Sequence, residues 1–105
     1  MKSYQRVCGA CHQPDGSGVP GMYPPLKQTE WVLGDPERLI NIVLNGLNEE
    51  IEVNGVVYKN AMPPQNYLND QEIAGILTYV RNNFGNEASE ITPGQVAEVR
   101  KKVAQ

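Results

Sequence analysis

The sequence lacks several features that define large functional classes. Its 105 residues contain no apolar run of about 18 residues, the length that a membrane-spanning helix needs. Lys and Arg number 9 against 12 Asp and Glu, so the basic excess typical of nucleic-acid-binding proteins is missing. Residues 1–7 are too few for a secretory signal and lead directly to the first cysteine. We therefore expect one domain over residues 1–105, with no membrane span and no nucleic-acid partner.

Cysteine and histidine are also scarce, with two and one in the chain, yet all three lie within Cys8-Gly9-Ala10-Cys11-His12. C-x-x-C-H is the attachment signature of c-type haem. Positions i and i+3 of a helix share a face, so Cys8 and Cys11 can reach the two vinyl groups of one porphyrin. The small residues between them let the backbone approach the ring. His12 is then expected to be the proximal ligand of the iron.

Three other uses of this motif need weighing. A thioredoxin-like dithiol would need a βαβ context, and no strand is predicted before Cys8. A zinc site would need a second pair of Cys or His, which the sequence does not contain. A disulfide between Cys8 and Cys11 is the third possibility. The motif favours haem attachment over all three, and the single histidine argues against most metallohydrolases.

Caps and apolar periodicity predict the elements around this motif. A long Gly- and Pro-rich loop suits a segment that wraps a haem edge. Asp35-Pro36 favours a helix start, Asn54-Gly55 a tight hairpin turn, and Asn69 with Glu72 a capping box. The expected elements are a helix over 3–11, a loop over 13–34, a helix over 36–45, a hairpin over 51–58, a helix over 70–84 ending at Gly85, a linker over 86–91, and a last helix from Thr92-Pro93.

The sixth ligand of the iron is expected to be a methionine, because no second histidine exists and thioether sulfur is a common partner. Met1 lies at the chain end, and Met22 follows His12 closely in a loop that leaves the proximal side. Met62 lies in an irregular segment braced by Pro63 and Pro64, which suits a ligand presented from a fixed loop. Met62 is therefore favoured over Met22, over a non-methionine ligand and over an open site. Packing in the core is the alternative role of Met62.

A thioether ligand would decide the function. It favours ferrous over ferric iron and so raises the reduction potential, and it closes the coordination sphere. A closed iron changes charge without binding substrate, as an electron carrier requires. An open iron would instead indicate a peroxidase-like enzyme or a gas-binding sensor.

With these motifs together, the chain resembles the class I c-type cytochromes over nearly its whole length. The fold implied is all-α: three main helices plus a C-terminal helix around one covalent haem, the first helix crossing the helix over 70–84, with a minor hairpin near 51–58. The residues that carry the resemblance are Cys8-x-x-Cys11-His12, Gly16-x-Gly18-x-Pro20-Gly21, Tyr23-Pro24-Pro25-Leu26, Ile51-Glu52-Val53-Asn54-Gly55, Met62-Pro63-Pro64, residues 73–81 and the Thr92-Pro93 tail.

The resemblance also implies site residues. His12 and Met62 would be the axial ligands of the iron. The carbonyl of Pro24 would accept a hydrogen bond from the free ring N–H of His12 and so fix the imidazole tautomer. Trp31 and Tyr58 would either reach a haem propionate or only pack, and their polar groups would need partners if buried.

Such domains occur as free carriers, as subunits of periplasmic dehydrogenases, and fused to oxidases or copper nitrite reductases. We lean towards a tethered domain that exchanges electrons with a reductase such as copper nitrite reductase, in the periplasm or another extracytoplasmic space. The family usually has a longer first helix, so we expect a truncated or processed N-terminus and weaker packing of that helix on Tyr79, Val80 and Phe84. Haem attachment takes place outside the cytoplasm, so an upstream signal or domain is also expected.

Overall fold

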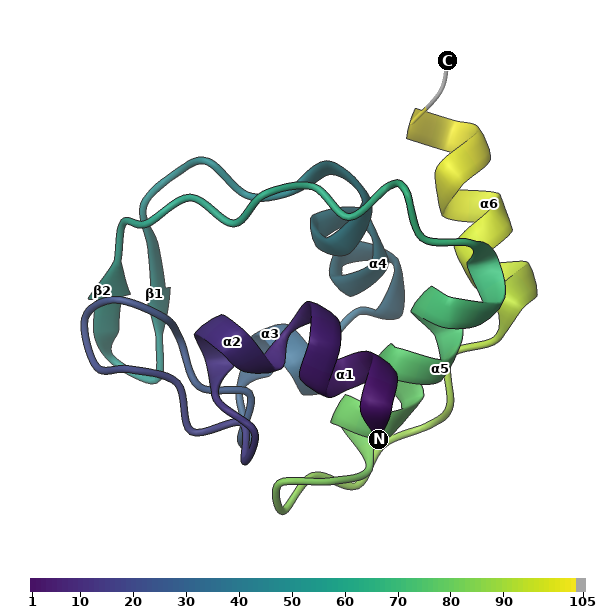
Figure 1. The fold of residues 1–105 in the computed structure, drawn as a ribbon. Coiled ribbons are helices and arrows are strands. Elements are labelled where there is room, and N and C mark those ends of the chain that lie inside the picture. The colour runs from purple at the N-terminus through teal and green to yellow at the C-terminus, as the bar shows by residue number, and fades with distance from the viewer. Residues whose placement is uncertain (104–105) are drawn as a thin grey trace.

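The computed structural model describes residues 1–103, and in this part of the chain it is mostly helical with one small sheet (Figure 1). This composition agrees with the predicted fold class, a mostly helical protein with a minor hairpin. None of the helices in the described range is long and apolar enough to cross a membrane. The elements are α1 (Lys2–Val7), α2 (Gly9–His12), α3 (Glu30–Leu33), α4 (Pro36–Asn45), β1 (Ile51–Val53), β2 (Val56–Tyr58), α5 (Asp70–Arg81) and α6 (Pro93–Val103).

The predicted helix over 3–11 is in fact two short helices, α1 and α2, that meet at Cys8. Glycine is a poor helix former, and Gly9 directly follows the break. The amide of Cys8 still donates to the carbonyl of Tyr4, and the amide of His12 donates to Cys8 at 2.9 Å. The two attachment cysteines therefore stay within one turn of each other.

The predicted loop over 13–34 is irregular up to Gln28 and then contains α3, which the sequence did not predict. Thr29 caps this helix, because its hydroxyl accepts from the amide of Val32 at 3.1 Å. Four residues are too few for a periodic apolar pattern, so only the cap could have indicated the helix.

Two central predictions are confirmed, since α4 spans Pro36–Asn45 and the hairpin pairs Ile51 with Tyr58 in antiparallel register. Asp35 caps α4 through its carboxylate, which accepts from the amide of Glu37 at 3.0 Å. Asn54 and Gly55 both have positive φ angles, of 50° and 84°, as a two-residue hairpin turn of the I′ type requires.

The start of α5 agrees with the prediction, but its end does not. The capping box of Asn69 and Glu72 is present in both directions. The helix ends at Arg81 rather than at residue 84, because the side chains of Asn82 and Asn83 donate to the carbonyls of Thr78 and Tyr79. Those side-chain bonds replace the next turn of the helix.

A second capping box opens α6, as the sequence predicts. The amide of Gln95 donates to the Thr92 hydroxyl at 3.1 Å, and the Gln95 side chain accepts from the amide of Thr92 at 2.8 Å. Helix α6 lies against α4 and α5, on the opposite side of the molecule from the hairpin (Figure 1). Residues 104 and 105, at the end of the expected single domain, lie outside the described residues.

The core lies between α4, α5 and α6, with α1 packed across α5. Ile40, Ile73 and Val96 are fully buried where the three long helices meet. Tyr4 is also fully buried, with its ring 5.5 Å from that of Tyr79. The short first helix is thus anchored on α5 through Tyr4.

Candidate haem site

An apolar cavity lies between α2, the helices α3, α4 and α5, and the two connections that lead to and from the hairpin. The space between its lining side chains, including the opening to solvent, is about 1050 Å³. All seven site residues predicted from the sequence line this one cavity. They are Cys8, Cys11, His12, Pro24, Trp31, Tyr58 and Met62.

One wall of the cavity consists of Cys11 and His12 of α2 together with Cys8, which lies where α1 and α2 meet. Both thiols are free, with Cys8 partly buried and Cys11 exposed. Burial, helped by the neighbouring Cys11, raises the pKa of the Cys8 thiol to about 11. A redox-active dithiol needs a lowered pKa, so this environment argues against the thioredoxin-like alternative.

His12 is held by a hydrogen bond from its Nδ1 to the carbonyl of Pro24, 2.8 Å away. A carbonyl can only accept, so Nδ1 carries the proton and the lone pair lies on Nε2. Burial lowers the pKa of His12, while the bond to Pro24 acts in the opposite direction. The ring therefore favours the neutral form that a metal ligand requires.

Met62 lies in the connection between β2 and α5, beside the connection that leaves α4. Its amide donates to the carbonyl of Leu47 at 2.8 Å, and the amide of Leu47 donates back at 3.0 Å. This isolated pair of bonds fixes the backbone of Met62 at the edge of the cavity. Met22, the second methionine considered, also lines the cavity but has 49% of its surface exposed.

Trp31 and Tyr58 reach the cavity from α3 and from the hairpin. The indole N–H of Trp31 donates to the carbonyl of Glu52 at 3.1 Å, so this polar group has a partner within the chain. The guanidinium of Arg38 lies 4.4 Å from the centre of the Trp31 ring. Tyr58 has only 5% of its surface exposed.

Sequence reasoning missed most of the apolar lining of the cavity. These side chains come from the inner faces of α3, α4 and α5, from the loop after α2 and from the connection after α4. The apolar periodicity of α4 and α5 is a signal that could have found several of them. They are Leu26, Val32, Leu39, Val43, Leu47, Ile76, Leu77 and Val80.

The arrangement fits a covalently held haem. Two unpaired thiols, an imidazole and a thioether line one largely apolar cavity, as covalent attachment and ligation of a flat apolar macrocycle require. Among residues 1–103, no group of three or more His, Cys, Asp or Glu could hold a metal ion. A porphyrin would supply most of the ligands of an iron bound here, and the imidazole of His12 and the thioether of Met62 are the candidates for the others.

Comparison with known proteins gives the same class. A family model for cytochrome c matches residues 1–84. Cytochrome c-552 of Thermus thermophilus is 34% identical, over 91% of this chain and 90% of that protein. The cytochrome c subunit of a quinone alcohol dehydrogenase from Gluconobacter oxydans is 38% identical, over 90% of this chain and 19% of the subunit. The gluconate 2-dehydrogenase cytochrome c subunit of Pantoea cypripedii is 35% identical, over 93% and 23%.

These observations define a small haem protein of the electron-transferring kind. The chain belongs to the cytochrome c family and fits the class I mono-haem cytochromes. Its cofactor is haem c, attached covalently through Cys8 and Cys11. Members of this family carry electrons and are not themselves catalysts.

Proposed function

We propose that the chain is a closed, six-coordinate electron carrier in which His12 and Met62 are the axial ligands of the haem iron. The observation that supports this assignment is the convergence of His12 and Met62, 50 positions apart in the sequence, on one apolar cavity. The same cavity is lined by both cysteines and by Pro24. No other imidazole exists in the chain to replace His12.

When bound, the haem supplies an iron that alternates between the ferric and ferrous states. The bond from His12 to Pro24 fixes the imidazole tautomer and makes its free nitrogen a stronger ligand. The thioether of Met62 favours the reduced state, which raises the reduction potential. Apolar side chains such as Leu77 and Val80 keep water away from the haem. The extra positive charge of the ferric state is therefore poorly solvated, which raises the reduction potential further.

The partner is proposed to be a dehydrogenase. Two of the relatives are named as cytochrome subunits of an alcohol dehydrogenase and a gluconate dehydrogenase, which supports this choice over the copper nitrite reductase suggested by the resemblance. We further propose that residues 1–105 form one domain, which works outside the cytoplasm. Trp31 and Tyr58 are proposed to line the haem by packing.

The test compares Met62→Ala with Met22→Leu in protein that carries haem. Ferric haem with a thioether ligand has a weak far-red absorption band. We expect Met62→Ala to remove this band, lower the reduction potential and bind cyanide faster, because the sixth position opens. Met22→Leu should leave all three unchanged.

Two results would contradict the proposal. Loss of the band in Met22→Leu, with the band retained in Met62→Ala, would make Met22 the ligand. Unmodified protein that lacks the band and binds cyanide rapidly would have an open iron, as expected for a peroxidase-like enzyme or a gas sensor.

A further inference from the structure

The segment that carries Met62 has its two ends held by different parts of the fold. We call residues 62–68 the Met62 segment. Its N-terminal end is fixed to the end of α4 by two contacts. Met62 and Leu47 exchange a pair of backbone hydrogen bonds, and the amide of Gln65 donates to the carbonyl of Val43 at 2.7 Å. No helix or strand includes this segment, so its shape depends on such contacts.

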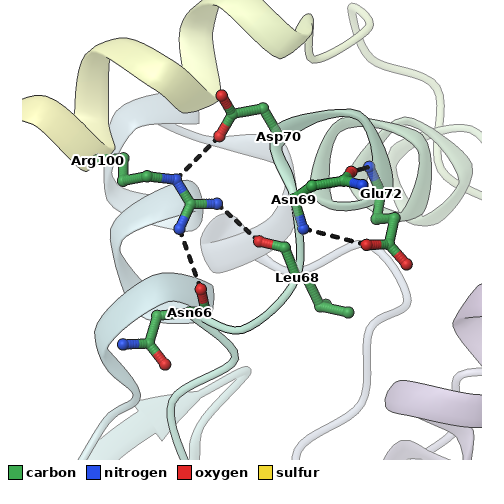
Figure 2. A network of polar contacts seen from close by, with 6 residues as sticks. All are labelled: Asn66, Leu68, Asn69, Asp70, Glu72 and Arg100. Carbon is green, nitrogen blue, oxygen red and sulfur yellow. Dashed lines mark hydrogen bonds and ion pairs between the residues drawn. The ribbon is translucent and has the colours of Figure 1, made fainter.

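The second end is held by one side chain of α6, Arg100 (Figure 2). Its guanidinium donates to the carbonyl of Asn66 at 3.1 Å, to the carbonyl of Leu68 at 2.8 Å and to the carboxylate of Asp70 at 2.9 Å. Figure 2 shows the three bonds leaving three different nitrogens of the same group. Arg100 therefore joins the end of the Met62 segment, the first turn of α5 and the last helix.

We propose that Arg100 is a positioning residue for Met62: by fixing the carbonyls of Asn66 and Leu68 it keeps the Met62 segment seated beside the cavity. This inference rests on the proposed ligand role of Met62. It also gives a role to α6, which lies beyond the residues matched by the family model, 1–84.

Arginine suits this role for a geometric reason. Its planar group offers several N–H donors in a fixed fork, whereas the ammonium of lysine is a compact charge on a flexible stem. Arg100 has only 33% of its side chain exposed, and Leu68 is buried, so its bond to the Leu68 carbonyl is shielded from competing water. Bonds from a charged donor are also stronger than neutral ones.

A second ion pair on α6 provides a matched control. Lys102 lies 2.9 Å from Glu37, the same separation as Arg100 from Asp70, but it joins α6 to the first turn of α4 and does not touch the Met62 segment. The side chains of Lys102 and Glu37 are both more than half exposed. Lys102→Met therefore removes a contact of α6 without removing any bond to residues 62–68.

The experiment compares Arg100→Lys with Lys102→Met in haem-loaded protein. Hydrogen exchange is measured at the amides of Met62, Gln65 and Leu68, together with cyanide binding to the ferric form and global unfolding in urea. We expect Arg100→Lys to accelerate both exchange at these amides and cyanide binding about tenfold, the effect of losing one charge-assisted hydrogen bond. Lys102→Met should leave both rates within about twofold of the unmodified protein, as expected for an exposed ion pair.

Equal effects of the two variants, or effects that only follow the change in global unfolding, would overturn the proposal. Faster exchange without faster cyanide binding would also overturn it, because the segment would then move without releasing Met62. If the unmodified protein lacks the thioether band, the ligand assignment itself fails, and the exchange rates alone still decide whether Arg100 holds the segment.

Discussion

Gly46 and Met62 approach each other so closely that a side chain on Gly46 would overlap the carbonyl oxygen of Met62. A Cβ there would also lie 2.9 Å from the nitrogen of Pro64. Gly46 ends α4 with a φ angle of 75°, a conformation that glycine adopts without strain. The end of α4 and the Met62 segment can therefore pack backbone to backbone.

We expect Gly46→Ala to displace Met62. The variant should lose the far-red band in part, bind cyanide faster and unfold with a free energy lower by about 2–4 kcal/mol, from left-handed strain plus overlap. Gly55→Ala is the matched control, since Gly55 has a φ angle of 84° but no atom near its missing Cβ. Gly55→Ala should lose only the stability that left-handed strain removes, and it should keep the far-red band. If both variants weakened the band equally, the close approach of Gly46 to Met62 would be unimportant.

Tyr4→Phe is expected to change the pH dependence of stability. The Tyr4 hydroxyl donates to the carbonyl of Gln13 at 2.8 Å, and burial raises its pKa well above the usual range. The unfolded phenol ionises near pH 10, so the stabilisation is complete below that pH, and each further pH unit removes about 1.4 kcal/mol. Urea unfolding at pH 7 should show a loss of about 1 kcal/mol in Tyr4→Phe.

At pH 11 the difference between Tyr4→Phe and the unmodified protein should nearly vanish. Tyr67→Phe is the control, because Tyr67 is 71% exposed and its substitution leaves Tyr4 in place. It should keep the alkaline decline in stability. A decline of the same size in Tyr4→Phe would show that another group causes it.

Asn86→Ala should destabilise the protein by about 2–3 kcal/mol, because this buried amide makes three hydrogen bonds. It donates to the carbonyls of Leu26 and Val80 and accepts from the amide of Gln28. Asn83→Ala loses one exposed bond and should cost no more than about 0.5 kcal/mol. Urea unfolding measures both, and similar losses would contradict the role given to Asn86.

Trp31→Phe is expected to loosen the hairpin and leave the reduction potential unchanged. The indole N–H is bonded to the carbonyl of Glu52, so its loss should accelerate amide exchange over residues 51–58 and cost about 1 kcal/mol. Arg38→Met removes only the cation above the ring and should affect this exchange less. A shift in potential with unchanged exchange would favour contact with a haem propionate instead.

Elements with local signals could be predicted from the sequence. The bounds of α4, the turn at Asn54-Gly55 and the capping boxes that open α5 and α6 all depend on residues within four positions of one another. The attachment motif is equally local. Periodicity also predicted that α5 exists, but not where it ends, because the side chains of Asn82 and Asn83 bond to the helix that they terminate.

Contacts between distant residues could not be predicted. The bond from the amide of Gln28 to Asn86 joins positions 58 residues apart, and Arg100 reaches Asn66 across 34. Arg81, the last residue of α5, has only 3% of its surface exposed. Nothing in the local sequence predicts that this charged residue is buried. For the site, the sequence indicated seven of the side chains that line the cavity, but neither the rest of its apolar lining nor the backbone bonds that hold these side chains in place.

Both attaching cysteines lie in the first twelve residues, on a short stretch that needs nothing from the rest of the chain to keep its prosthetic group. Unfolding therefore does not release the haem into solution. A dissociable ligand stabilises a fold in proportion to its concentration, by mass action. Here the haem stays bound to the unfolded chain, so its packing into the fold is an intramolecular step. The unfolding midpoint should therefore be independent of protein concentration and of added free haem. Refolding should likewise need no free haem.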